Sequence, residues 1–222
     1  MSQSAKALFN RRKQAITKEK QYYNKFIFNG HFSVFLVILL GAFILGYGEW
    51  LQTMPKNINY ALIVSIIVAI TSLFPIRTLL KEADKLFLLP FEQHMSTYMK
   101  KSLVYSYMLR VGMQIVIVLI FFPLFYVLNN QTFSFYIVFA IVALINPMLG
   151  LLLKWQWYKY KLEGWSVHTL LFILYTAMYY VTLEVKNLSG LPIVIILIAL
   201  IVLLRYLNQK QLFPWERMIN AE

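Results

Sequence analysis

A chain of 222 residues with 60% hydrophobic and 14% charged residues differs from a soluble domain, in which about 25% of residues are charged. Its net charge of +12 would suggest nucleic acid in a soluble chain, but here we assign it to loops beside an anionic membrane leaflet and expect no nucleic-acid partner. The absence of cysteine excludes disulfides and thiolate metal sites.

Residues 1–31 form the first predicted element, a cytosolic basic amphipathic helix. Apolar residues recur there at helical spacing while basic residues fill the other face; the apolar positions are Leu8, Phe9, Ile16, Tyr23, Phe26 and Ile27. A helix of this kind lies in the plane of the lipid headgroups. We expect the Asn29–Gly30 pair to end it before the first membrane span.

Six continuous apolar stretches follow, each long enough to cross a hydrocarbon layer about 30 Å thick. They comprise residues 32–51, 58–76, 103–128, 133–153, 165–185 and 188–204. In lipid every backbone amide needs an internal partner, so the spans should be helices. The sequence therefore predicts an all-α, polytopic integral membrane protein with six transmembrane helices within residues 32–207. Short outer loops should pack span one on two, three on four, and five on six.

Lysine and arginine are concentrated on one side of this predicted membrane. They lie in the N-terminal tail, the second and fourth loops and the C-terminal tail, except for Lys56, Lys186 and Arg110. By the positive-inside rule, both termini and the second loop face the cytosol. Arg110, near the start of the third span, should reach the inner interface by snorkelling.

The cytosolic connection 77–102 is the longest internal loop. At about 100° per residue, its apolar residues fall on one arc and predict a short amphipathic helix that ends before Pro90; they are Leu79, Leu80, Ala83, Leu86 and Phe87. Residues 88–91 then form an apolar tip. Two interpretations stay open: the stripe rests on the bilayer with the tip tucked under the spans, or the helix docks into a groove of a soluble partner.

Polar and helix-breaking residues within the spans are further candidates. Tyr175, Tyr179 and Thr182 share one face of the fifth span, where they either hydrogen-bond to other helices or line a polar translocation path. Pro123, and Asn146 with Pro147, interrupt backbone hydrogen bonding and are candidate hinges. We expect no catalytic, cofactor-binding or metal residues, because no catalytic motif, phosphate loop or metal-ligand pair is present.

Three short strings carry a family resemblance. Residues 81–90 resemble the EAD-x-x-FLL segment of the EcsB family of ABC transporter permeases from Gram-positive bacteria. The Phe-Pro-Trp-Glu string at 213–216 and the start of the chain at 8–12 also look like this family. Family members continue past the Phe-Pro-Trp-Glu string, so the cytosolic tail 208–222 marks either a natural short form or a part of a longer protein.

The resemblance implies a permease of the bacterial plasma membrane that pairs with a separate cytosolic ATPase of the EcsA kind. ATP and magnesium would bind to that ATPase, so this chain would be no enzyme, and a permease homodimer is compatible with the family. In ABC exporters the loop between spans two and three supplies a coupling helix. The residues of this ATPase-coupling loop would be Arg77, Lys81, Glu82, Ala83, Asp84, Lys85, Phe87, Leu88, Leu89, Pro90, Phe91 and Glu92.

Three function classes remain in comparison. A transport permease would export amphipathic, peptide or lipid-like cargo, since the spans lack a charged pore lining. A non-transporting membrane scaffold, such as a secretion-accessory or protease-regulating protein, fits the span count equally well. An intramembrane enzyme would need a polar constellation near mid-bilayer, where the sequence offers only scattered hydroxyls. A neighbouring reading frame for an ATPase would favour the permease over the scaffold.

Overall fold

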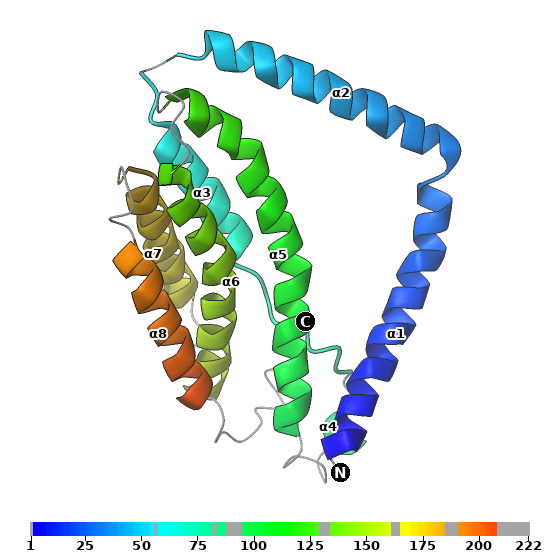
Figure 1. Cartoon of the computed structure of the whole chain (residues 1–222). Helices are drawn as coiled ribbons and strands as arrows, with labels where there is room; N and C mark the ends of the chain where they lie inside the picture. Colours follow the sequence, from blue (N-terminus) through cyan, green and yellow to red (C-terminus); the bar gives the residue numbers. More distant parts are fainter. Residues whose placement is uncertain are drawn as a thin grey trace. The chain divides into compact units, whose positions relative to one another are not determined.

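The computed structural model describes residues 2–55, 57–81, 84–87, 95–128, 134–160, 165–184 and 191–207. All regular structure in these ranges is α-helical, as predicted (Figure 1). The chain divides into two compact units, Ala7–Ile58 and a larger one that comprises Met1–Lys6 and Asn59–Glu222.

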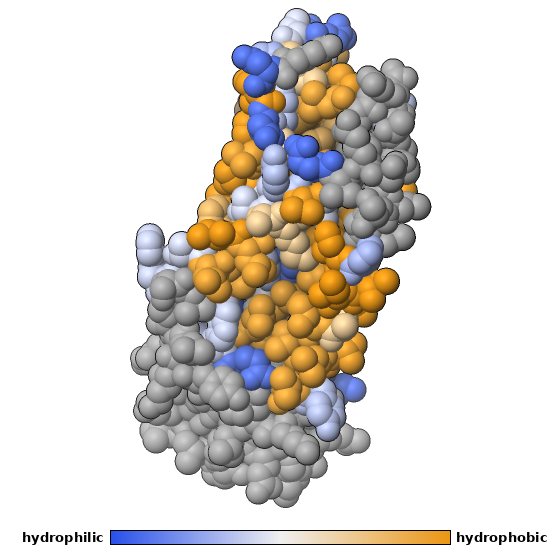
Figure 2. All heavy atoms as spheres, turned by 90° about the vertical axis from the view of Figure 1, so that its left-hand side faces the viewer, coloured by the Kyte–Doolittle hydropathy of each residue, from blue (hydrophilic) through white to orange (hydrophobic). Residues whose placement is uncertain are grey.

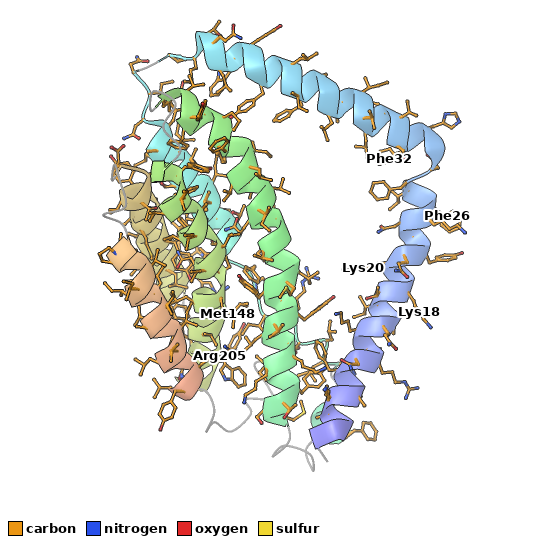
Figure 3. The ribbon with its side chains drawn as sticks, viewed as in Figure 1. Lys18, Lys20, Phe26, Phe32, Met148 and Arg205 are labelled. Carbon is orange, nitrogen blue, oxygen red and sulfur yellow. The ribbon has the colours of Figure 1, made fainter. Side chains whose placement is uncertain are left out.

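The smaller unit contains the first helix from Ala7 on and the whole of the second helix. α1 (Ser2–Ile27) and α2 (Gly30–Thr53) meet at Asn29, whose side chain accepts a hydrogen bond from the backbone N–H of Phe32 at 3.0 Å and caps α2. The predicted break at Asn29–Gly30 is thus confirmed. Figure 3 shows Lys18 and Lys20 on α1, with Phe26 and Phe32 on either side of the bend.

α2 exposes apolar side chains along its whole length. None of its residues is buried, and the rings of Phe43, Tyr47 and Trp50 stack on one another with centroids 5.9 Å apart. A helix that is hydrophobic all round needs an apolar environment on every side. This is the behaviour expected of the first predicted span.

The larger unit is a helix bundle with α6 at its centre. It contains α3 (Tyr60–Ser72), the short α4 (Asp84–Phe87), α5 (Met95–Leu128), α6 (Ser134–Tyr160), α7 (Trp165–Glu184) and α8 (Leu191–Leu207). α6 packs against α3, α5, α7 and α8 (Figure 1). Its middle contributes Phe139, Val142 and Ala143 to the core.

The packing partners differ in part from those that loop length predicts. α5 packs on α6, which confirms the pairing of spans three and four. The pairing of spans five and six is wrong, because in the described residues α7 packs mainly on α3 and α8 packs on α6. Hydrogen bonding explains the difference: α7 carries buried hydroxyls that find partners on α3 and α6, whereas the apolar α8 needs only an apolar surface.

Within the described residues, three helices are long and apolar enough to cross a membrane: α2, α5, and the part Tyr136–Tyr158 of α6. α3 and the part Pro192–Leu207 of α8 are apolar but shorter. The face of the bundle on the side of α7 and α8 is predominantly hydrophobic (Figure 2), with exposed residues such as Ile173, Ile195 and Val202. These features are those of a membrane protein; the number of spans and the cytosolic termini stay predictions.

The second predicted span ends as a helix four residues earlier than expected. The prediction extends to Ile76, but α3 stops at Ser72, where the N–H of Leu73 bonds to the carbonyl of Ile70 at 3.3 Å. Pro75 explains the stop, because proline has no N–H to donate and disfavours helical geometry in the residue before it. Residues 73–81 continue without regular structure.

Candidate functional site

The connection after α3 is held against the first turns of α5 by three buried hydroxyls. Ser106 Oγ accepts from the N–H of Arg77 at 2.8 Å, and Tyr98 OH donates to the carbonyl of Thr78 at 2.8 Å. Ser102 Oγ donates to the same carbonyl at 3.4 Å. Tyr98, Ser102 and Ser106, which we call the α5 hydroxyl row, are spaced four apart and therefore share one helix face.

Backbone geometry at Leu79 contradicts the predicted start of the coupling helix. Leu79 has a φ of 58°, and residues 73–81 are not helical. A branched residue in this left-handed region is strained, so the surroundings must hold it there. The bonds from the α5 hydroxyl row to Thr78 supply that restraint, and the periodicity of the apolar residues could not reveal it.

Asp84 begins the short helix α4. Its Oδ2 accepts from the N–H of Lys81 at 2.6 Å, while its own N–H donates to the carbonyl of Lys81 at 2.9 Å. A carboxylate three residues after a cap that reaches back in this way is one half of a capping box. The buried Asp84 therefore shapes the connection, whereas Phe87 at the other end of α4 is 75% exposed.

The predicted coupling residues are only partly within the described chain. Arg77 and Lys81 are exposed, Asp84 is buried and Phe87 is exposed. The side chain of Lys85 lies outside the described residues, as do Glu82, Ala83, Leu88, Leu89, Pro90, Phe91 and Glu92. Contact of this loop with an ATPase stays a prediction.

A second tie joins the connection to α6. Lys154 is buried, and its Nζ donates to the carbonyl of Phe74 at 2.8 Å. This carbonyl follows the end of α3 and has no helical partner, so the ammonium group satisfies it. In the sequence, Lys154 counted only as one charge of a cytosolic loop.

A polar network joins three helices inside the bundle. Ser72 Oγ on α3 lies 2.7 Å from Tyr179 OH on α7 and accepts from Gln114 Nε2 on α5 at 2.7 Å. Thr71 Oγ1 donates to Gln114 Oε1 at 3.1 Å. In a setting of low dielectric such chained bonds polarise one another and specify which helices pack together.

Tyr175 reaches the backbone of α6 through a gap left by a glycine. Its hydroxyl donates to the carbonyl of Asn146 at 3.2 Å. A Cβ on Gly150, one turn further along α6, would lie 2.5 Å from that hydroxyl. Asn146 is fully buried, and its Nδ2 lies 3.8 Å from Met178 Sδ on α7.

The predicted pathway and hinge residues are thus placed as follows. Tyr175 and Tyr179 are buried and bonded to neighbouring helices, and Thr182 bonds to the carbonyl of Tyr179 at 2.8 Å. α5 and α6 each continue as one helix through Pro123 and Pro147. The contacts of the two tyrosines are those of the interhelical alternative, whereas Thr182 bonds within α7; a role in a pathway or as hinges stays a prediction.

The residues that bond to the connection after α3 or to the tyrosines of α7 were not identified from the sequence. The α5 hydroxyl row has a detectable signal, since its members recur every four residues. Ser72 and Gln114 have only a weak signal, as isolated polar residues in apolar stretches. Gly150 has none, because nothing in the sequence indicates that a tyrosine of α7 comes within contact of it.

Comparison with known proteins agrees with the family resemblance that rests on the strings at 8–12, 81–90 and 213–216. A model of the family described as bacterial ABC transporter protein EcsB matches residues 6–222. The chain belongs to the EcsB family. The description of that family names ABC transport, and the apolar helices of this chain are those of a membrane protein.

One curated relative extends this comparison. Protein EcsB of Bacillus subtilis (strain 168) is 24% identical over 221 residues, which cover 97% of this chain and 54% of the relative. The chain therefore spans about half the length of that relative. No solved structure matches it.

Proposed function

We propose that this chain is the membrane permease part of an ABC transporter, and that a separate EcsA-like ATPase drives it by gripping the loop 77–102. ATP and magnesium would bind to the ATPase, and this chain would perform no catalysis. The cargo would be amphipathic, peptide or lipid-like, and it would be exported. Membership of the EcsB family is the basis for the ATPase partner.

The double attachment of the connection 73–81 carries the proposal. A coupling element needs an exposed end for the ATPase and a firm link to the membrane helices. Phe87 is exposed on α4, while the connection before it is bonded to α5 by the α5 hydroxyl row and to α6 by Lys154. A displacement of α4 would therefore move both helices.

The length of α5 fits the same role. At about 1.5 Å per residue, its 34 residues extend for about 50 Å, well beyond a hydrocarbon layer of about 30 Å. The part after Arg110 is about 27 Å long, close to the thickness of that layer. The part before Arg110 would then project into the cytosol. It carries the α5 hydroxyl row, so a movement of the loop would be transmitted through it to the membrane-spanning part of α5.

Charge substitution at the loop tests the proposal. Phe87→Asp, Leu88→Asp and Leu89→Asp should each abolish co-purification of an EcsA-like ATPase co-expressed with this chain, since an apolar docking contact does not tolerate an unpaired carboxylate. The amount of each variant in the membrane fraction should equal that of the wild type. The measurement is the yield of ATPase captured on the tagged permease.

Trp165→Asp is the matched control. Trp165 is 89% exposed at the start of α7, on the same predicted side of the membrane, and lies outside the loop. It should leave ATPase capture unchanged. If all three loop variants capture the ATPase at wild-type yield, the docking assignment is wrong and a non-transporting scaffold becomes the better proposal.

A further inference from the structure

Three cations converge where α3 ends. The guanidinium of Arg110 lies over the ring of Phe74, with Cζ 4.9 Å from the ring centroid, and Lys154 binds the carbonyl of the same Phe74. Arg110 is close enough to both Arg77 and Lys154 for their like charges to interact. Arg77, Arg110 and Lys154 are here called the basic cluster.

No carboxylate offsets these charges within the described residues. The acidic groups there are Glu19, Glu49, Asp84 and Glu184. Asp84 is the one in the neighbouring connection, and its carboxylate caps α4 through Lys81. Like charges gathered in a partly buried place repel one another, and a bound anion would offset the repulsion.

Arg110 carries an unsatisfied donor at this place. Among the described residues, its buried Nε has no hydrogen-bond partner and its Nη1 has only the sulfur of Met113, at 3.3 Å. A thioether is a weak acceptor, whereas a guanidinium pairs best with the oxygens of a carboxylate or phosphate. The side chain that α5 holds here is therefore short of an oxyanion partner.

Exposed apolar side chains flank the basic cluster along both helices. Ile67 and Ile70 lie on α3, ahead of Phe74, and both are exposed. Leu109 and Met113 lie beside Arg110 on α5 and are exposed as well. Arg110 lies about 27 Å along α5 from its outer end, and Lys154 about 30 Å along α6 from its outer end. Both distances correspond to one boundary of a hydrocarbon layer about 30 Å thick.

We propose that the basic cluster binds the phosphate headgroup of an anionic membrane amphiphile, whose chains lie against the exposed apolar flank of α3 and α5. The charge matches the head, the apolar residues match the chains, and the depth matches the headgroup layer. Neither transport nor an ATPase is needed for this site, so it stands or falls separately from the permease proposal.

Lipid titration of the purified chain in neutral detergent tests the site. Binding to the native state raises Tm, so the apparent affinity follows from the shift with lipid concentration. Phosphatidylglycerol should stabilise the wild type more than phosphatidylcholine. Arg110→Gln and Arg77→Gln should each weaken the phosphatidylglycerol affinity about tenfold, the effect of losing one charge-assisted bond.

Arg205→Gln is the control for general attraction. Arg205 lies toward the C-terminal end of α8 (Figure 3), outside the basic cluster. Its substitution removes the same charge as Arg77→Gln or Arg110→Gln. It should keep the wild-type affinity. Equal affinity for the two lipids, or an equal loss in Arg205→Gln, would overturn the site.

Competition with inorganic phosphate distinguishes a site for a lipid headgroup from a site for free phosphate. Inorganic phosphate should compete with phosphatidylglycerol only at far higher concentration, because it lacks chains to contact the apolar flank. If inorganic phosphate competes at a concentration similar to that of phosphatidylglycerol, the proposal that the ligand is an amphiphile is wrong. Arg77 is exposed, so Arg77→Gln should fold even if Arg110→Gln does not, and the site can be judged on it alone.

Discussion

Gly150 is the residue at which α6 and α7 depend most closely on one another. A methyl group there would overlap the hydroxyl of Tyr175, which is fully buried and cannot move aside freely. The same hydroxyl holds the carbonyl of Asn146, next to Pro147, where the backbone lacks a donor. The absence of a side chain at Gly150 thus leaves room for the hydrogen bond between Tyr175 and the α6 backbone.

Gly150→Ala should lower the free energy of unfolding by about 1–3 kcal/mol, because overpacking outweighs the better helix propensity of alanine. Adding Tyr175→Phe removes the clashing oxygen and should restore most of the loss. The measurement is thermal unfolding in detergent of both single variants and the double variant.

Gly112→Ala on α5 is the control for that cycle, since a Cβ there meets nothing within 4 Å. It should be neutral or slightly stabilising. Strict additivity of Gly150→Ala and Tyr175→Phe would show that the two residues do not meet.

At the scale of elements, the connection 73–81 is the part that departs most from a regular helix. Extended backbone within a membrane protein is tolerated only where protein buries it and satisfies its polar groups. Phe74, Ile76 and Thr78 are buried, and the side chains of α5 and α6 supply the hydrogen bonds. At no more than about 3.3 Å per residue, residues 73–76 can add up to about 13 Å to the roughly 20 Å of α3, enough in total to reach across a bilayer.

Ser106→Ala should loosen this connection without unfolding the bundle. It frees the N–H of Arg77, so amide hydrogen exchange over residues 74–81 should become faster while the free energy of unfolding falls by about 1 kcal/mol. Exchange measured by mass spectrometry on peptides from this segment reports the change.

Tyr107→Phe serves for comparison, because it removes another hydroxyl of α5 that donates to a carbonyl, that of Leu144, at 3.0 Å. It should cost similar stability yet leave exchange over 74–81 as in the wild type. Identical exchange in both variants would mean that the α5 hydroxyl row does not hold the connection.

The whole molecule is organised by an orientation that charge alone predicts. Arg77 follows the end of α3, Arg110 lies within α5 and Lys154 lies toward the end of α6, yet the three gather on the same predicted side of the membrane. Their gathering on one side is what the positive-inside rule requires of a cytosolic face. Both the ATPase proposal and the lipid site assume that this side is inside.

Single cysteines can test the orientation directly, because the chain has none. In intact cells, Lys56→Cys and Lys186→Cys should react with a membrane-impermeant maleimide. Lys100→Cys should react only after permeabilisation. Labelling in the reverse pattern would place the coupling loop outside the cell and remove the basis of the permease proposal.

The sequence alone was enough for the helical class, the membrane setting and the family. Long apolar stretches and the uneven distribution of charge are local or summed properties, so they can be recognised without knowing which residues are in contact. Asn29 and Pro75 likewise act on their immediate neighbours, so the sequence carries a local signal for the start of α2 and for the end of α3.

Only the tertiary structure decided which polar groups meet. Ser72 with Tyr179, Gly150 with Tyr175, and Lys154 with Phe74 are far apart in the chain, and no spacing rule relates them. The packing of α7 on α3 rather than on α8 and the left-handed Leu79 follow from such contacts. A buried polar group takes whichever partner the folded helices bring near, and that choice belongs to the assembled bundle rather than to any one segment.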